Sequence, residues 1–383
     1  MSWPRRIFFA LAAPVAALVF SLVVSGIVLE ISGHNAIDAF KSMWQYTDST
    51  ESVVATINRA IPYYVSALAV AIGFKMALFN IGVDGQLRMA AVLAAAAGAA
   101  VNFTVPVVQV TYIILVAVAV GAAWAFIAAI LKVWRGVSEV ISTIMLNSIA
   151  TALTAYLLAN YLKAKNAPGD LVIKTRLLPP SSFIPPLNRF FELFGFHLPP
   201  NTQLNGFFVG AVLLGVGFYV LVWRTRFGFD LRASGANPAA ARAAGVNPKA
   251  MIVKTMLISG GIAGLVAIGP LLGDPQFHRY GEQFPTTLGF TGIAVALVGR
   301  NHPVGIAFSA LLFAYIERAT QVLALQNIPQ EISKIMQGSI ILSAVIAYEI
   351  VRRARVAAEV RDAAAKAEPR AAAGGAIPEP VPA

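Results

Sequence analysis

Long apolar runs are the feature that most constrains this chain. The sequence is 58% hydrophobic and only 12% charged, whereas a soluble domain carries roughly twice that charge. In lipid every backbone polar group must be satisfied internally, so such runs form helices. We therefore predict an all-α, polytopic membrane protein with about ten transmembrane helices of about 20 residues each. The runs lie near 7–29, 52–72, 88–103, 107–131, 140–161, 206–223, 251–272, 286–299, 303–323 and 332–350.

The third and eighth runs, 88–103 and 286–299, are short and rich in Gly and Ala, so we expect broken or re-entrant segments there. The chain also carries a faint internal duplication. Gly82-Val83-Asp84-Gly85 recurs as Gly289-Phe290-Thr291-Gly292, and Ser142-Thr143-Ile144-Met145 recurs as Ser333-Lys334-Ile335-Met336. Both offsets are compatible with two weakly repeated five-helix halves. Interrupted segments at corresponding positions of two halves are the usual pointer to a transport pathway.

Basic residues predict the orientation. Lys and Arg concentrate in short cytoplasmic loops, and the net charge of +11 gathers at span ends rather than in a nucleic-acid patch. Arg5 and Arg6 precede the first run, which lacks a cleavage pattern and is read as a retained span. Arg352, Arg353 and Arg355 follow the last run. We therefore place both termini and the loop 224–250 in the cytoplasm and the segment 163–203 outside the membrane.

Three regions complete the domain plan: residues 1–50 form an N-terminal span and outer loop, 51–350 the main membrane domain, and 357–383 a cytoplasmic tail. The tail is rich in Ala, Pro and Gly and is expected to be disordered. Within the outer segment, apolar side chains fall at helical spacing. They indicate either a helix lying on the outer leaflet or a docking ledge for an external partner. These residues are Leu187, Phe190, Phe191 and Phe194.

The cytoplasmic loop 224–250 contains a miniature helix. Asn237 is a good N-cap, Pro238 suits the first helical position and Gly245 suits the C-cap. The residues between them, including Ala240, Arg242 and Ala244, are mostly small. Such a helix is too short to span a membrane. It is either a surface that another protein grips or an ordinary helix that orders a long loop.

Polar side chains interrupt the apolar pattern at two places. Asn80, Asp84 and Gln86 lie around Gly82 and Gly85, whose flexibility frees backbone groups from helical pairing. This segment either lines a pathway or forms a cytoplasmic turn between helices.

The second place is the start of the fifth run, where Glu139, Thr143 and Asn147 share one helix face. Glu139 fits the membrane edge, and Asn147 lies about two turns deeper. We predict that Asn80, Asp84, Gln86 and Asn147 contribute polar groups to a substrate pathway. In the ninth run Glu317 and Arg318 read as a charge pair at the outer edge.

The motifs of common catalytic and metal sites are missing from the sequence. It has no G-x-x-x-x-G-K-[ST] phosphate loop, no H-E-x-x-H and no cysteine. The four histidines, His34, His197, His278 and His302, have no metal-ligand spacing. We therefore expect no catalytic residue and no metal site in this chain.

Four motifs together resemble a known family. They are the segments 79–87 (FNIGVDGQL), 139–147 (EVISTIMLN), 289–297 (GFTGIAVAL) and 299–303 (GRNHP). They are similar to the permease subunits of bacterial ATP-binding-cassette (ABC) importers for branched-chain amino acids, ribose-type sugars and nucleosides, with the strongest likeness to nucleoside (purine-type) permeases. The resemblance runs from about residue 50 to 350. Asp84 stands where many relatives have Glu, and Ser138 where a larger polar residue is common.

The resemblance implies a permease that works by alternating access and binds no cofactor itself. ATP would be hydrolysed on separate cytoplasmic ATPase subunits, which would grip the helix 237–245 as a coupling helix. The expected further partners are a second permease subunit, homologous or identical, and an extracytoplasmic solute-binding lipoprotein. Nucleosides are the implied solutes, with sugars or branched-chain amino acids as the alternative.

Two rival classes remain. An ion-coupled secondary transporter would need acids embedded at mid-depth, and this chain has few. A membrane-embedded enzyme would need a convergent cluster of His, Asp and Ser, and none is recognisable in the sequence.

Overall fold

A computed structural model describes residues 19–164, 172–192, 195, 198–199, 202–326, 328–329, 331–332, 334–343, 346, 350 and 353. The start of the first run, the basic residues Arg5, Arg6, Arg352 and Arg355, and the tail 357–383 lie outside the described residues. The chain divides into two compact units, one formed by Met1–Phe40 with Ile328–Ala383 and the other by Lys41–Asn327.

The first unit brings together the two ends of the chain. The helix Val19–Ile31 carries Ser21, whose hydroxyl donates to the Met336 carbonyl at 3.2 Å, 315 positions away in the sequence. Leu29, Ile332 and Ile340 are buried. The first and last predicted runs therefore pack against one another.

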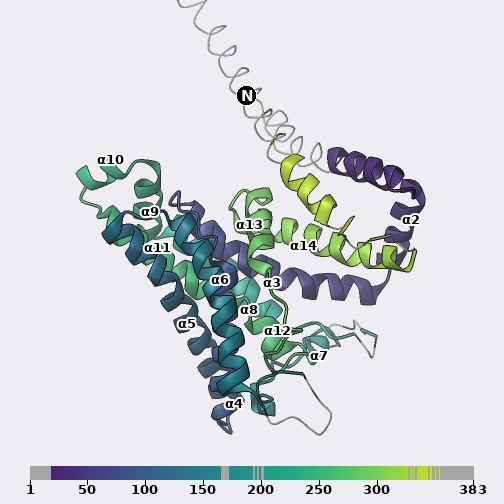
Figure 1. Ribbon diagram of the computed structural model, residues 1–383, viewed down its shortest axis with the longest axis horizontal. Helices are drawn as coiled ribbons and strands as arrows, with labels where there is room; N and C mark the ends of the chain where they lie inside the picture. The colour runs from purple at the N-terminus through teal and green to yellow at the C-terminus, as the bar shows by residue number, and fades with distance from the viewer. Residues whose placement is uncertain are drawn as a thin grey trace, which may run out of the picture. The chain divides into compact units, whose positions relative to one another are not determined.

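The second unit is a helical bundle (Figure 1). Its longer helices are α3 (Thr50–Phe74), α4 (Val83–Ala100), α5 (Pro106–Arg135), α6 (Glu139–Leu157), α8 (Phe207–Arg224), α11 (Pro248–Leu265), α13 (Leu288–Val298) and α14 (Pro303–Ala319). Shorter helices are α7 (Asn188–Glu192), α9 (Arg226–Ala236), α10 (Pro238–Ala243) and α12 (Ile268–Gly273), and α2 (Ala36–Thr47) joins the two units. A π-helical turn (Leu158–Leu162) extends α6, and 3-10 turns occupy Pro180–Ser182 and Thr320–Gln326.

The all-α class is confirmed, but the count of ten spans is not. Among the described residues six helical segments are long and apolar enough to cross a membrane: Thr50–Phe74, Pro106–Arg135, Glu139–Leu162, Phe207–Arg224, Pro248–Gly273 and Pro303–Gln326. The bent pair Val19–Ile31 and Ala36–Thr47 would make seven if it is one span.

The two runs expected to be short differ from ordinary spans for physical reasons. Run 88–103 falls in α4, which has Asp84, Gln86 and Arg88 in its first two turns. Run 286–299 forms α13, whose 11 residues rise only about 16 Å. Helix α13 alone is too short for a complete crossing, since the hydrocarbon core is about 30 Å thick, whereas the 18 residues of α4 rise about 27 Å.

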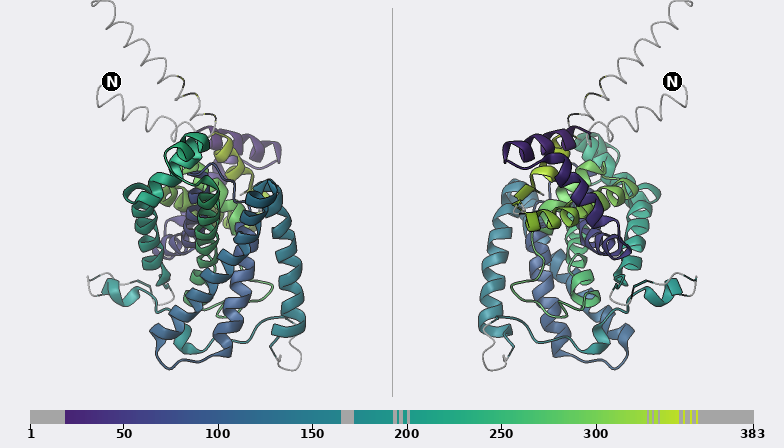
Figure 2. Two further views of the ribbon diagram at one scale, coloured as in Figure 1. Left: turned by 90° about the vertical axis from the view of Figure 1, so that its left-hand side faces the viewer. Right: turned by 90° about the vertical axis from the view of Figure 1, so that its right-hand side faces the viewer.

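Helix α3 is the centre of the bundle. It begins at the N-cap Ser49, whose side chain accepts from the Ser52 N–H, and it packs against α8, α11, α13 and α14. Its second half is almost wholly buried, from Val65 to Gly73. Figure 2 shows the blue and teal helices α4, α5 and α6 running beside one another, consistent with their mutual contacts. At one end of the long helices lie α9 and α10, and at the other end lies α12 (Figure 1).

Helices α5 and α11 make the closest contact because small residues face one another. A Cβ atom added at Gly121 would collide with the Gly260 carbonyl oxygen, and one added at Gly264 would collide with the Ala117 carbonyl oxygen. In membranes such small faces let two backbones approach closely, which helps helices associate without a hydrophobic drive between them. The α5–α11 contact therefore depends on glycines, because residues without a side chain let the two backbones approach.

We predict that Gly260→Val destabilises the protein by about 1–3 kcal/mol or more, because overpacked interiors must shift backbone. Gly217→Val is the matched control, since Gly217 is also helical but has no atom within 4 Å of an added Cβ. Thermal unfolding in detergent measures both. Equal melting temperatures for the two variants would contradict this account of the α5–α11 contact.

Candidate functional site

The segment after α3 re-enters the bundle. At the end of α3 the Leu78 N–H donates to the Gly73 carbonyl at 3.0 Å, and Ala77 takes a left-handed conformation with φ 55°. The chain then returns to Asn80, whose Nδ2 donates to Ser259 Oγ at 2.8 Å, while Ser259 donates to the Ala69 carbonyl at 2.5 Å. Ala69 lies about 7–8 Å before the end of α3. Helix α4 therefore begins inside the bundle, so the segment is more than a turn between two helix ends.

A closed amide pair fixes this re-entrant segment. Asn80 and Gln86 exchange two hydrogen bonds, each 3.0 Å long, and Asn80 Oδ1 also accepts from the Gly82 N–H at 3.1 Å. Both side chains are 1% exposed. Buried amides without partners would be costly, and here each satisfies the other.

Asn147 joins the same segment to α6. Its Nδ2 donates to the Ile81 carbonyl at 2.9 Å and its Oδ1 accepts from the Gly85 N–H at 2.8 Å. Eight residues earlier, Glu139 pairs with Lys132 Nζ at 2.5 Å, at the end of α5. Asn147 lies about 12 Å along α6 from that ion pair. The depth of Glu139 and Asn147 in the membrane stays a prediction.

Asp84 connects the starts of α4 and α13. Its Oδ1 accepts from the Gly289 N–H at 2.8 Å, at the first turn of α13, and its side chain is buried. Beside it Ser66 Oγ donates to the Leu288 carbonyl at 2.9 Å. The first N–H groups of any helix lack intrahelical partners, and a carboxylate there is also favoured by the helix dipole.

The faintly repeated motifs around Asp84 and Gly289 therefore meet in space. Asp84 and Gly289 are the second residues of α4 and α13. Helix α13 ends four residues before His302, whose ring centroid lies 5.3 Å from that of Trp223 at the end of α8. Glycine is required on the α13 side, because a Cβ at Gly289 would lie 2.6 Å from the Asp84 nitrogen. We call the cluster of Asn80, Asp84, Gln86, Asn147 and Gly289 the polar hub.

A polar cavity of about 960 Å³ lies beside α3 and α14. Its charged and amide side chains come from α3, the 202–205 loop, the 274–276 loop and α14; they are Glu51, Asn58, Arg59, Gln203, Asn205, Asp274, Gln276, Glu317, Arg318 and Gln321. Pro62 of α3 and Pro285 also line it. Ser66 lies one helical turn beyond Pro62 and Leu288 three residues beyond Pro285, so the polar hub lies next to the cavity along both segments.

An ion pair crosses this cavity from α3 to α14. Arg59 binds Glu317 through two contacts, Nη2 to Oε1 at 2.6 Å and Nε to Oε2 at 3.0 Å, and the Tyr63 hydroxyl also donates to Glu317. The predicted pair of Glu317 with Arg318 is therefore corrected. Neighbouring residues on a helix point in different directions, and Arg318 donates to Gln321 Oε1 at 2.9 Å instead.

The ion pair also reveals functional candidates that the sequence analysis missed. Arg59 lies in the apolar run 52–72, where a charged residue is expensive and suggests function. That signal was present in the sequence. Asn58 and Asn205 carried no comparable signal, because they come together only through folding: Asn58 Oδ1 accepts from the Asn205 N–H at 2.9 Å.

The miniature helix predicted at 237–245 is present as α10. The Asn237 side chain accepts from the N–H groups of Ala239 at 3.0 Å and Ala240 at 3.1 Å, and Pro238 is the first helical residue. Gly245 takes the left-handed conformation with φ 83°. Ala241 is buried, whereas Ala240, Arg242 and Ala244 are exposed. The capping prediction is confirmed, and the coupling role of these residues stays a prediction.

The segment 163–203 contains little of the predicted surface helix. Among the described residues of this segment the α-helix is confined to Asn188–Glu192, beside the 3-10 turn Pro180–Ser182, and Phe194 lies outside the described residues. Part of the segment pairs instead with the loop before α13: the Thr175 N–H donates to the Tyr280 carbonyl at 2.8 Å, and the Leu178 N–H to the His278 carbonyl at 3.0 Å. This pairing holds the loop that leads into α13.

Comparison with known proteins places this architecture in a family. Residues 52–345 match the family described as "Branched-chain amino acid transport system / permease component". The chain belongs to this family: it is a multi-pass membrane protein and a permease component of an ABC transporter. Such components function with ATPase and solute-binding partners.

Named relatives align over most of the chain. The guanosine ABC transporter permease protein NupP of Bacillus subtilis is 33% identical over 89% of this chain and 94% of its own. The nucleoside ABC transporter permease protein NupB of Lactococcus lactis is 28% identical over 88% and 91%. The glucose ABC transporter permease protein TsgB13 of Haloferax volcanii is 30% identical over 92% of each chain. No solved structure matches significantly.

The four predicted pathway residues thus gather in the polar hub. Because the chain belongs to a family of permeases, the polar hub is a candidate part of a solute pathway. Asn80, Gln86 and Asn147 use their amides within the chain, and Asp84 binds α13. Their direct contact with solute stays a prediction.

We predict that Asp84→Ala destabilises the protein by about 1–3 kcal/mol, because the buried Gly289 N–H loses its acceptor. Asp84→Asn keeps an acceptor oxygen of similar reach and should cost less. Thermal unfolding of the two variants in detergent measures the difference. If the alanine and asparagine variants melt together, the hydrogen bond to α13 is not what Asp84 contributes.

Proposed function

We propose that this chain is the transmembrane permease subunit of an ATP-driven importer of nucleosides. The observation that carries the proposal is the end-to-end similarity to the guanosine and nucleoside permeases, which covers nearly nine-tenths of this chain. The solute would move by alternating access, and ATP would be hydrolysed on separate subunits. This chain would supply the pathway and no catalytic group.

The polar cavity supports an uncharged, hydroxylated solute. Its volume of about 960 Å³ is at the upper end of the range for small-molecule sites. The Gln203 side-chain amide lines the cavity and has both donors and acceptors, whereas Asn58 and Asn205 each bind the chain through one donor and one acceptor. Arg59 and Glu317 neutralise one another across the cavity, and the remaining charged side chains that line it, Glu51, Asp274 and Arg318, carry both signs.

We place the cavity toward the outer side, with the polar hub as its inner boundary. In this arrangement the N-termini of α4 and of the short helix α13 meet at mid-depth, the level at which transporters commonly hold solutes. Asn80, Asp84, Gln86 and Asn147 then act at the inner boundary of the pathway, where rearrangement of Asp84 and Gly289 would connect the cavity with the cytoplasm.

The partners we propose are two ATPase subunits, a second permease subunit and an extracytoplasmic solute-binding lipoprotein. The coupling contact is α10 with its flanking caps, formed by Asn237, Pro238, Ala240, Arg242, Ala244 and Gly245. Its exposed face is small and uncharged apart from Arg242, so a groove on another protein could receive it closely.

The second candidate solute is a sugar, which the glucose permease relative favours. The test is uptake by the chain assembled with its ATPase and binding protein in liposomes. We expect ATP-dependent uptake of labelled guanosine or other nucleosides, competed weakly by glucose, ribose and leucine. Preferential glucose uptake would support the sugar candidate. Uptake that survives ATP depletion and collapses with an ion gradient would support a secondary transporter.

We predict that Ala240→Glu abolishes co-purification of the ATPase subunits. A docked helix would place this carboxylate in a closed interface, at a cost of several kcal/mol, on the order of a hundredfold or more in affinity. Ala240→Ser is the matched control and should keep the complex together. Full retention of the ATPase and of solute-stimulated ATP hydrolysis in the glutamate variant would exclude α10 as the coupling helix.

We predict that α10 faces the cytoplasm and the 163–203 segment faces outward. The chain has no native cysteine, so single cysteines report their own position. In intact cells an impermeant maleimide should label Arg176→Cys and leave Ala240→Cys unlabelled until the membrane is opened. The reverse pattern would invert the proposed topology.

A further inference from the structure

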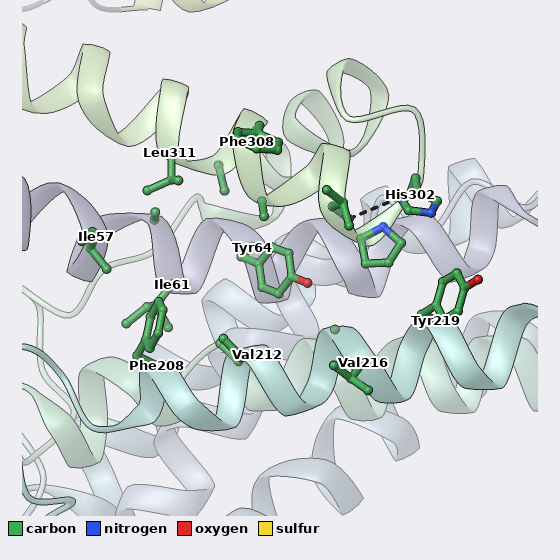
Figure 3. Close-up of a pocket in the computed structure, with 17 residues that line it drawn as sticks. Ile57, Ile61, Tyr64, Phe208, Val212, Val216, Tyr219, His302, Phe308 and Leu311 are labelled. Atoms are coloured by element: carbon green, nitrogen blue, oxygen red, sulfur yellow. Dashed lines mark hydrogen bonds between the residues drawn. The ribbon is translucent and has the colours of Figure 1, made fainter. Parts of the chain in front are cut away.

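A second cavity, separate from the polar one, lies between α3, α8 and α14 (Figure 3). It encloses about 700 Å³ and is lined by 17 residues. Apart from Tyr64, Tyr219 and His302, all of them are apolar. Figure 3 shows Ile61 and Tyr64 of α3, Val212 and Val216 of α8, and Phe308 and Leu311 of α14 around the same space. Several of these, including Val216 and Phe308, are exposed. The cavity is therefore an apolar groove that is open on one side.

The length of the groove matches one leaflet of a bilayer. Along α8 its lining runs from Phe208 to Tyr219, which corresponds to a rise of about 16 Å. Half of a 30 Å hydrocarbon core is about 15 Å. The groove thus has the length of the acyl region of one leaflet, whereas a solute pathway would have to cross both.

One end of the groove lies near the positive charges of Lys75 and Arg232. His302 and Tyr219 line this end, and Trp223 stacks on Tyr219 with ring centroids 5.4 Å apart. Lys75 Nζ lies 4.9 Å from the Trp223 ring centroid. Tyr and Trp side chains are typical of the membrane–water interface, so this end is where lipid headgroups are expected.

These cations have no acidic partner of their own. Burial, and then the positive charge of Arg232, lower the pKa of Lys75. Burial, and then Lys75, lower the pKa of His302. Within the described residues no carboxylate lies within ion-pair distance of Lys75 or Arg232. Because the positive charges of Lys75 and Arg232 repel one another and have no counter-ion among these residues, an anion that binds beside them would relieve this repulsion.

We propose that the groove binds an anionic phospholipid, with its acyl chains between α3, α8 and α14 and its phosphate beside Lys75 and Arg232. Basic pockets between transmembrane helices are suited to anionic headgroups. The end that bears Lys75 is the end of the bundle that carries α9 and α10, so the lipid belongs to the cytoplasmic leaflet if the topology proposed above holds.

Volume favours lipid chains over a protein helix. A helix about 10 Å wide and 16 Å long would occupy about 1,250 Å³, nearly twice the volume of the groove. Two extended hydrocarbon chains, each about 4.5 Å wide at carbon contact distances, would occupy about 500 Å³ over the same length. The groove therefore accommodates the two chains of one phospholipid, whereas a helix would lie only partly inside it.

The test is mass spectrometry of phospholipid that co-purifies with the full chain in mild detergent. We expect the anionic lipid retained per protein to fall on the order of tenfold in the double variant Lys75→Gln/Arg232→Gln. Lys249→Gln is the charge control, because Lys249 is exposed at the start of α11 away from the groove, and it should retain the lipid. Equal retention in the double variant and the wild type would overturn the proposal.

A steric pair tests the acyl half of the site. Ala307→Trp fills the groove and should displace the lipid, whereas Val209→Trp, on an exposed α8 position outside the lining, should not. A change of oligomeric state in Ala307→Trp without loss of lipid would identify a second copy as the occupant and overturn the proposal.

A wild-type experiment keeps the test valid if Ala307→Trp does not fold. A phospholipid with a photoreactive acyl chain, in vesicles of otherwise zwitterionic lipid, should crosslink to peptides that contain Val212–Val216 or Phe308. Crosslinks spread evenly over all exposed helices, or equal labelling by anionic and zwitterionic probes, would overturn the site.

Discussion

The rest of the bundle depends on one contact, the hydrogen bond from the Gly289 N–H of α13 to Asp84 of α4. Both helices begin inside the protein, so their first N–H groups have no intrahelical acceptor and no water in a bilayer interior. Asp84 supplies an acceptor to the partner helix, and the missing side chain of Gly289 allows the approach. The Asn80–Gln86 pair and Asn147 then hold the re-entrant segment that presents Asp84.

This arrangement explains how a chain in lipid can contain a polar interior. The polar cavity is bounded by α3, which is continuous, and by segments that lead into α13, which is not. Its one bonded charge pair, Arg59 with Glu317, is made between two helices, and each partner would be costly if left alone in a low dielectric. A core closed to water would be lined by apolar side chains. These polar groups are therefore consistent with a water-accessible space.

Several parts of this architecture were accessible from the sequence because they are local. The helical class and the caps of α10 depend on residues within one segment, and both predictions are confirmed for the described residues, whereas the count of ten spans is not. The short length of the apolar run 286–299 was also visible in the sequence. The predicted pair of Glu317 with Arg318 was wrong because two residues adjacent in sequence point in different directions on a helix. Asn58 and Asn205 were missed because 147 positions separate them.

The sequence by itself determined the class of this protein, since apolar runs in lipid leave the backbone no choice but helices, and its motifs carry the family relationship. Only the tertiary structure decided what the polar residues do. The segment with Asn80, Asp84 and Gln86 could equally have formed a turn between helices, and it is the packing of α4 against α6, α11 and α13 that brings this segment to Asn147 and Gly289. The physical reason is that hydrogen bonds inside a membrane are satisfied between segments distant in sequence, and a linear pattern does not specify which segments meet.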